Sequence, residues 1–302
     1  MCIRGDSMEL NRKILRTGII IISFSIIISL GFIMAIKLDR PVFLKSYTES
    51  MIFASEPSYR GSEFVLKYIT NVSDNRKVID IYFDEYPDLV LYAGKSSSRV
   101  DMFPMIPQYN YSKEEIYGRY VIKNLYVKID GKNLGEFDEV ELNNAKITFD
   151  NGESINADLG RIIFYNYSPY KEEHFDFSRS RSSTDGTSST EMGVTEDIII
   201  ANLDSPLLKD IDDLIEIKIG ETNYKDISEI QYKSGETIRI NSRLEYPRDI
   251  LRKYSLYYLE PKVYYKDSNG NSFYRRIRNI EYVNYDYEIW GLVKYLKARG
   301  EL

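Results

Sequence analysis

Few residues in this 302-residue chain could do chemistry, and their types narrow the possible reactions. His174 is the only histidine and Cys2 is the only cysteine. A serine or cysteine nucleophile normally needs a histidine as its base, so such a mechanism would have to use His174, which borders a Ser/Thr-rich segment. Zinc sites of the usual Cys/His type need more of these ligands than the chain contains. The sequence therefore predicts no catalytic residues, no metal site and no cofactor.

Carboxylates are the remaining candidates for acid–base chemistry or for Ca²⁺ binding. They gather at Asp84, Glu85 and Asp88, and again between Asp210 and Glu216. Two carboxyl groups about 5–10 Å apart in a cleft would suit a glycoside hydrolase, and a loop of oxygen ligands would suit Ca²⁺. Neither group matches a calcium loop, and solvated surface carboxylates explain both. A carboxylate-based hydrolase acting on envelope glycans is the alternative function.

Residues 17–36 form an uncharged, apolar stretch near the N-terminus. As a helix this stretch would be about 30 Å long, which matches the hydrocarbon core of a bilayer. A cleavable signal has an apolar region of about 7–15 residues before a small-x-small site, and here the bulky Ile33 stands two residues before Ala35. We therefore expect an uncleaved transmembrane helix over residues 17–36, with the lipid bilayer as a partner.

The basic residues around this stretch predict its orientation. They are more closely spaced before it than after it: Arg12, Lys13 and Arg16 against Lys37, Arg40 and Lys45. The positive-inside rule then favours a cytoplasmic tail over residues 1–16 and an external C-terminal part. We expect a single-pass protein of the cell membrane with its C-terminal domains outside, and the reversed topology is the alternative.

Composition restricts the compartment and the partners. A single cysteine excludes an intrachain disulfide framework, which for an external domain favours a bacterial envelope. The net charge of −6 argues against a nucleic-acid surface, so no nucleic-acid partner is expected. The 27 tyrosines are typical of half-buried strand positions and of binding surfaces.

Short strand-like runs dominate the chain beyond residue 41. They alternate or are rich in β-branched and aromatic residues, and they are bounded by turn residues such as Asp130-Gly131 and Asn269-Gly270. Residues 178–197 are Ser/Thr/Gly-rich and predict a flexible linker, or else a long excursion within one sheet. We expect a mainly β chain of two antiparallel, immunoglobulin-like β-sandwich domains over residues 41–177 and 198–302.

A similarity between two segments of the sequence supports two related halves. Residues 146–155, KITFDNGESI, resemble residues 229–238, EIQYKSGETI. Each would form a strand, a turn that requires glycine, and a return strand.

Two segments are the expected contact sites for a partner. Residues 94–115 contain prolines without strand periodicity, and their apolar and aromatic members are Pro104, Met105, Ile106, Pro107, Tyr109 and Tyr111. The C-terminal run YEIWGLVKYLKAR has the spacing of an amphipathic helix, with Trp290 at the edge of its apolar face. That helix packs on the second domain, or else it contacts a partner or a membrane surface through Trp290.

These observations together predict a non-enzymatic binding or assembly module. It would be anchored in a membrane, face the outside of the cell, and contact another membrane or envelope protein. A tethered sandwich usually presents loops or an edge strand to such a partner.

Overall fold

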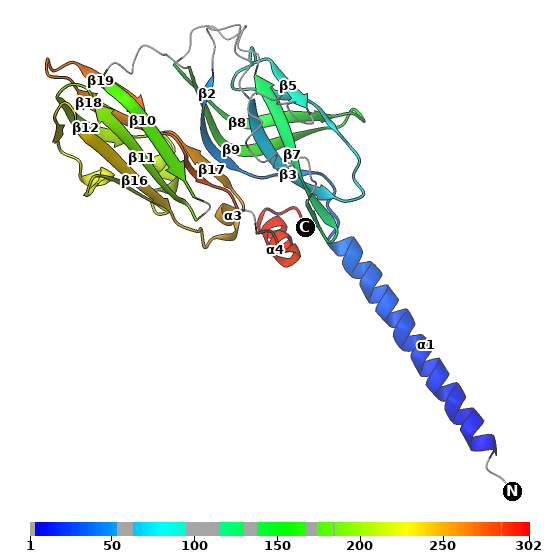
Figure 1. Cartoon of the computed structure of the whole chain (residues 1–302). Helices are drawn as coiled ribbons and strands as arrows, with labels where there is room; N and C mark the ends of the chain where they lie inside the picture. The colour runs from blue at the N-terminus through cyan, green and yellow to red at the C-terminus, as the bar shows by residue number, and fades with distance from the viewer. Residues whose placement is uncertain are drawn as a thin grey trace, which may run out of the picture.

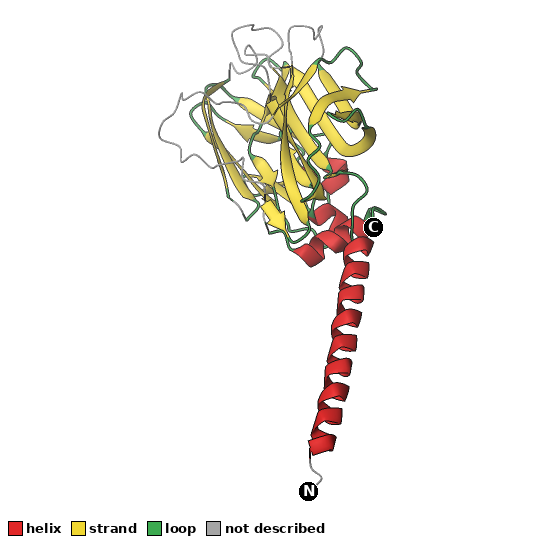
Figure 2. Ribbon diagram, turned by 90° about the vertical axis from the view of Figure 1, so that its right-hand side faces the viewer, coloured by secondary structure: helices red, strands yellow, loops and turns green. Residues whose placement is uncertain are grey.

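One long helix and many strands make up the chain. The helix α1 (Arg4–Ala35) comes first, and strands dominate the rest of this computed structural model (Figure 1). The structure describes residues 4–52, 63–94, 115–129, 138–166, 174–183, 185–284 and 286–302. The segment Ile14–Phe32 of α1 is long and apolar enough to cross a membrane, and none of it is buried. The helix projects from one end of the β-rich part, which we call the body (Figure 2).

Two sheets, A and B, enclose the first core of the body. Sheet A runs in the order β1 (Val42–Phe43), β3 (Glu63–Asn71), β7 (Tyr120–Ile129) and β5 (Leu91–Gly94), and β6 (Glu115–Tyr117) also pairs with β7. Sheet B runs in the order β20 (Ile280–Tyr282), β17 (Leu256–Leu259), β2 (Ser46–Ile52), β9 (Ser154–Asn166), β8 (Glu139–Phe149) and β4 (Val78–Phe83).

Sheets C and D enclose the second core. Sheet C runs in the order β10 (Phe175–Ser182), β11 (Thr187–Val194), β16 (Thr237–Leu244), β13 (Ile215–Ile219) and β14 (Thr222–Asn223). Sheet D runs in the order β15 (Ile230–Tyr232), β12 (Ile198–Asp204), β18 (Lys262–Lys266) and β19 (Ser272–Arg276). The short helices are α2 (Leu208–Ile211), η3 (Tyr224–Asp226), α3 (Ile250–Lys253) and α4 (Ile289–Ala298).

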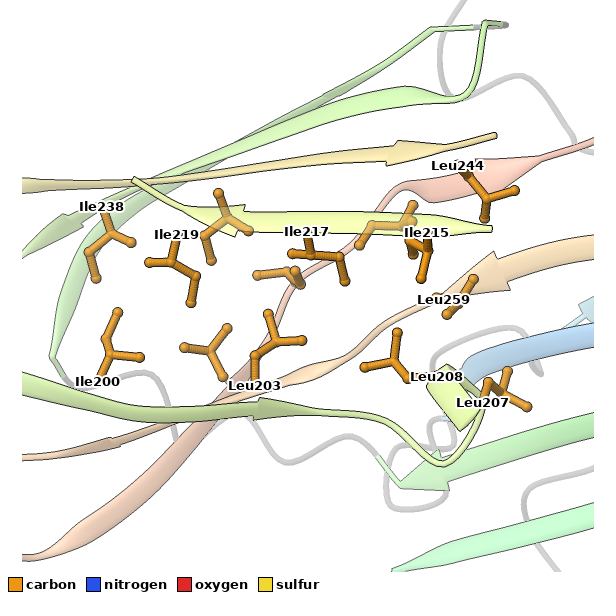
Figure 3. Packing of buried hydrophobic residues seen from close by; sticks show 14 of the residues in the cluster. Ile200, Leu203, Leu207, Leu208, Ile215, Ile217, Ile219, Ile238, Leu244 and Leu259 are labelled. Atoms are coloured by element: carbon orange, nitrogen blue, oxygen red, sulfur yellow. The ribbon is translucent and has the colours of Figure 1, made fainter. Parts of the chain in front are cut away.

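Alternating apolar side chains fill the space between the sheets. In β16 every second residue is buried, because the side chains of a strand point to opposite faces in turn. Figure 3 shows Ile217 and Ile219 of β13 facing Ile200 and Leu203 of β12 across the second core. Each fully buried Ile or Leu of this kind stabilises the fold by about 1.5–3 kcal/mol.

Sheet B joins the two halves of the sequence. Its strand β2 is parallel to both neighbours, so that Ser46 lies opposite Gly160 of β9 and opposite Leu256 of β17. Parallel neighbours require a long crossover connection, so they come from distant parts of the chain. The strands β17 and β20 also contribute to the second core, through Tyr257, Leu259, Ile280 and Tyr282.

The predicted fold class is confirmed: the chain is mainly β, with packed sheets, an N-terminal apolar helix and a short C-terminal helix. The mixed pairing around β2 was not anticipated. The division into domains at residues 41–177 and 198–302 stays a prediction, and sheet B contains strands from both ranges.

The prediction of a flexible linker over residues 178–197 is wrong. This segment supplies β10 and β11, which pair from Phe175 opposite Val194 to Ser182 opposite Ser188, and β12 begins at Ile198. Hydroxyl groups on facing strands bond each other, as in Ser180 with Thr190 at 2.9 Å, and the backbone groups of β10 and β11 pair in the ladder between them. The alternative of an excursion within one sheet therefore fits the structure.

Candidate functional site

The chain enters the body directly where α1 ends. After Ala35, the apolar side chains of Ile36, Leu38, Val42 and Leu44 are all buried. Neither Gly nor Ser interrupts residues 35–44, so no flexible linker separates the helix from the strands. The direction of α1 is therefore set by the packing of the body.

Polar side chains of sheet A hold this entry segment by its backbone. Asn71 of β3 accepts a hydrogen bond from the Leu38 amide at 3.2 Å and donates one to the Leu38 carbonyl at 2.6 Å. The hydroxyl of Tyr120 donates to the carbonyl of Ile36 at 2.6 Å. Burial raises the pKa of Tyr120, which keeps that hydroxyl protonated as a donor. Both side chains are buried, so these bonds do not compete with water.

Helix α4 covers the entry segment from the other end of the sequence. Its apolar face packs against residues of the entry segment and of sheet A in one cluster: Leu292, Val293, Tyr295 and Leu296 against Leu38, Val42, Leu44, Ile69, Tyr120 and Ile122. A Cβ at Gly291 would lie 2.1 Å from the hydroxyl oxygen of Tyr254, so glycine is needed for this close approach. We call residues 36–44, α4, Asn71 and Tyr120 the collar.

The outer face of α4 differs from its packed face. Trp290, Lys294 and Lys297 are exposed, and their spacing places them on one side of the helix. The Trp290 ring is 60 % exposed, and its centroid lies 6.0 Å from that of Phe32 in α1. A tryptophan flanked by lysines is suited to the boundary between lipid and water, where the ring contacts acyl chains and the ammonium groups reach the headgroups.

The predicted contact residues have different outcomes. Trp290 lies on the collar, at the start of α4. This helix was expected to pack on the second domain, whereas its apolar face packs against the entry segment and sheet A, and also against Tyr254 and Tyr287. Pro104, Met105, Ile106, Pro107, Tyr109 and Tyr111 lie outside the described residues. The role of all seven in partner binding stays a prediction.

A buried carboxylate pair that sequence reasoning missed lies where sheets B and D meet. Glu49 of β2 accepts hydrogen bonds from the amide of Glu260 at 2.7 Å and from Arg276 at 3.3 Å. Tyr165 donates to the carboxylate of Glu260, and the Arg276 guanidinium lies 3.7 Å from the Tyr165 ring centroid. The one available signal was Glu49 inside an otherwise strand-like run, a charge at a position that alternation makes inward.

Burial governs the titration of this pair. It raises the pKa of Glu260 to about 7 despite the nearby Arg278 and Arg276, and the Glu49 carboxylate raises it further. Burial also raises the pKa of Glu49, against the lowering effect of Arg276 and of the Glu260 amide. Glu49 has no exposed surface and Glu260 is only 4 % exposed, so neither carboxyl group is open to a glycan substrate.

Several of the carboxylates singled out from the sequence are bound by separate partners. Asp210 pairs with Arg161 at 2.5 Å, Asp212 with Lys225 at 2.6 Å and Asp213 with Arg252 at 2.7 Å. Glu85 accepts hydrogen bonds from the amides of Asn143 and Asn144 at 3.3 and 3.0 Å. Each one fixes a loop or strand end, and the described residues contain no group of three or more His, Cys, Asp or Glu that could hold a metal ion.

His174 has a packed, hydrogen-bonded position. Its ring contacts the hydroxyl of Tyr265 at 3.0 Å through Nδ1 and Glu196 at 2.6 Å through Nε2, and it packs edge-on against Phe273. The Ser/Thr-rich segment that follows His174 begins with the strand β10, so this side chain borders a sheet. These contacts tie β10 to sheet D.

Comparison with known proteins identifies no family. No protein-family model matches the sequence, and no curated protein matches it. Among solved structures, the chain is similar to the D00–D0 domain of intimin, with 8 % identity, a TM-score of 0.23, and coverage of 81 % of this chain and 100 % of that one. It is also similar to the Pseudomonas aeruginosa CupB2 chaperone (9 % identity, TM-score 0.18, coverage 77 % and 98 %).

A third similar structure is the sialic acid binding region of a Streptococcus sanguinis adhesin bound to 3'sLn. It has 10 % identity, a TM-score of 0.19, and coverage of 79 % of this chain and 76 % of that one. At these TM-scores, the likenesses decide nothing about the function of this chain.

Proposed function

We propose that this chain is a single-pass membrane protein of a bacterial envelope that holds a non-enzymatic binding module in a fixed orientation. Helix α1 spans the bilayer with its N-terminus in the cytoplasm, and the body lies outside. The body presents its loops and sheet faces to another membrane or envelope protein, or to the polymers around it.

The collar is the observation that carries this proposal. The segment that follows α1 without a break is buried and hydrogen-bonded through Leu38 and Ile36, so the end of α1 is joined directly to the packed body. Cleavage after Ala35 would place a charged amino group on Ile36, whose side chain is buried. A helix that continues into such a segment is suited to remain as an anchor.

The exposed face of α4 supports the same placement. Trp290 lies beside Phe32, at the end of the apolar segment of α1 where a spanning helix would leave the hydrocarbon. Lys294 and Lys297 lie on the same face, at the depth of anionic headgroups. The collar would then rest on the membrane surface, so the body cannot tilt freely.

The only tryptophan of the chain tests this placement directly. We would reconstitute the full chain in nanodiscs with lipids brominated near the headgroup and measure the quenching of Trp290 emission. We expect strong quenching, because the ring would contact the upper acyl chains. A matched control combines Trp290→Phe with Tyr92→Trp, which moves the fluorophore to an exposed position on β5, away from α1 (Figure 1).

Unquenched emission from Trp290 would contradict the placement of the collar on the membrane surface. Equal quenching of Trp290 and of the control tryptophan would contradict it as well, because the two positions would then be equally close to lipid.

Orientation and partner binding need separate experiments. Protease added to intact protoplasts should digest the body, and a protected body would establish the reversed topology.

Cross-linked pull-down of the full chain from membranes should recover a specific envelope or membrane protein. The variant Tyr109→Ser with Tyr111→Ser should lose that protein, whereas Tyr92→Ser, on an exposed strand, should keep it. Retention by the double variant would remove residues 104–111 as the contact.

A further inference from the structure

The outer face of sheet C is a polar surface with an excess of positive charge. Strand register sets the side chains in rows across the sheet. One row is Arg181, Ser189, Asn241 and Lys218, and the next contains Thr187, Arg243 and Glu216. A third row contains Arg179, Glu191 and Arg239. These rows hold five cations and two anions, in a chain whose net charge is −6.

A groove of about 460 Å³ lies over this face. Its charged lining consists of Arg181, Lys218, Arg243 and Glu216, and the rest of the lining is hydroxyl groups and one amide. Lys218 pairs with Glu216 at 2.7 Å. Within the described part of the chain, Arg181 and Arg243 form no ion pair, and both are exposed. Glu216 lies opposite Arg243 and interacts with it electrostatically, but it pairs with Lys218, so both guanidinium groups can bind a ligand.

We propose that this groove binds a linear anionic polymer with a hydroxylated backbone, carrying phosphate or carboxylate groups along its length. Two guanidinium groups on separate strands can each bind an anionic group with two parallel hydrogen bonds. The serine and threonine hydroxyls and the Asn241 amide can both donate to and accept from polymer hydroxyls. The row from Arg181 to Lys218 crosses three inter-strand spacings of about 4.8 Å, so it can follow a short stretch of extended polymer.

This assignment deepens the proposed function by naming the ligand class of the module. Figure 1 shows β10, β11 and β16 in a lobe beside the collar, with neither α1 nor α4 lying over them, so neither helix covers the groove. The overall negative charge of the chain repels polyanions elsewhere, which favours this face over the rest of the surface.

The test measures binding of the full chain in nanodiscs to four probes of similar length: a poly(glycerol phosphate), a polyuronate, a neutral dextran and a polyglutamate peptide. We expect the poly(glycerol phosphate) or the polyuronate to bind, the dextran not to bind, and polyglutamate to bind more weakly. The stronger of the two polyanions identifies the anionic group. Affinity should fall as salt rises, because the polymer releases counterions on binding.

The decisive variant is Arg181→Gln with Arg243→Gln. We expect its Kd for the preferred polymer to rise about tenfold or more, with a shallower salt dependence. The reason is that two guanidinium groups, each able to form two parallel hydrogen bonds with an anion, are lost. The matched control is Arg248→Gln with Lys266→Gln, two exposed cations outside the groove that change the net charge equally. Arg181→Lys with Arg243→Lys should give an intermediate Kd, since lysine keeps the positive charge but cannot form the two parallel hydrogen bonds of a guanidinium group.

Three results would overturn the assignment. They are failure of both polyanions to bind the unaltered chain, equal losses in the groove variant and its control, and tighter binding of polyglutamate than of either polymer. The last would assign the face to an acidic protein. If brominated lipid quenches Trp290 but no polymer binds, the polymer proposal is wrong and the placement of the collar on the membrane surface still holds.

Discussion

The buried pair of Glu49 and Glu260 makes the stability of the body depend on pH. Burial raises the folded-state pKa of Glu260 to about 7, above its ordinary value of 4.5. The group therefore stabilises the fold fully below about pH 4.5, and this contribution is lost as pH rises through about 7. Above that range the folded protein must hold an ionised, buried carboxylate beside Glu49.

We expect Glu260→Gln to flatten this decline. The variant should match the unaltered protein at pH 4 and exceed it at pH 8 by up to roughly 3 kcal/mol in the free energy of unfolding. Urea unfolding across this pH range measures the difference, with the exposed Glu245→Gln as the control. Parallel pH profiles for Glu260→Gln and the unaltered protein would contradict the expectation.

Asn71 is the second residue whose removal should have a measurable effect. Asn71→Ala leaves the amide and carbonyl of Leu38 without their partners in a buried place, and we expect a loss of about 2–3 kcal/mol in the free energy of unfolding. Thermal unfolding followed by circular dichroism measures this loss. The control Asn156→Ala removes an exposed side chain of β9 and should change stability by less than about 0.5 kcal/mol. Similar losses in the two variants would show that the collar does not depend on Asn71.

At the scale of elements, the parallel pairing of β2 with β9 depends on one glycine. Gly160 has a φ of +86°, and an added Cβ would lie 2.5 Å from the backbone oxygen of Ser46 on β2. Gly152 has a φ of +85° with nothing within 4 Å of such a Cβ. The two positions therefore share backbone strain and differ in steric contact.

We expect Gly160→Ala to destabilise the body by about 2–3 kcal/mol and Gly152→Ala by about 1 kcal/mol. Equilibrium unfolding in urea compares the two variants directly. Equal losses would mean that β2 can move away from β9 without cost, which would contradict a tight register at Ser46.

Strands with local signals were predicted, and strands that depend on distant partners were not. The alternation in residues 237–244 and the apolar run in residues 198–203 predict β16 and β12, because each has enough buried side chains of its own. The strand β10 has few, and it forms because β11 supplies hydrogen bonds and Tyr265 and Phe273 hold His174 at its start. Composition alone does not show these contacts.

The similarity between residues 146–155 and 229–238 also shows that local sequence does not determine which strands pair. Residues 146–155 form the predicted hairpin, with Ile147 opposite Ile155 in sheet B. In the second copy, β15 pairs with β12 in sheet D, and β16 pairs with β11 in sheet C. Similar local sequences therefore form a hairpin in one place and a connection between two sheets in the other, since distant strands compete for the backbone bonds.

At the scale of the molecule, the collar couples α1 to the body through α4. Leu292 and Leu296 are fully buried there. We expect Leu292→Ala with Leu296→Ala to release residues 36–44, because each truncation removes about 2–5 kcal/mol of packing. Limited trypsin digestion should then cut after Lys37 while the rest of the body stays intact; the bond after Arg40 resists trypsin because Pro41 follows it.

The matched control is Ile147→Ala, which leaves a comparable cavity between sheets A and B. It should lower overall stability without creating a cut after Lys37. Cleavage there in the control, or its absence in the double variant, would contradict the role of α4 as the cover of the entry segment.

The collar itself was only partly predictable. The amphipathic spacing of residues 289–298 predicts a packed helix, and the apolar stretch at residues 17–36 predicts a helix of spanning length. Neither pattern shows that the two helices meet beside the entry segment. The bonds that fix this segment to sheet A connect residues 33 and 84 positions apart, as in Leu38 with Asn71 and Ile36 with Tyr120. The Arg/Ser face of sheet C was hidden for a similar reason, since the rows appear only once strand register is known.

The composition of the collar also sets the order in which the protein can be completed during synthesis. Leu38 leaves the ribosome long before Leu292, and at about 5–20 residues per second the delay is on the order of tens of seconds. For that time the apolar residues just after α1 have no cover. Strand β2 also stays unpaired until β9 has been made, and its other edge stays unpaired until β17 has been made. Helix α4 is made after the strands that it covers, and it fixes the body on α1. A chain that stopped before α4 would therefore keep α1 and lose the fixed orientation of the body.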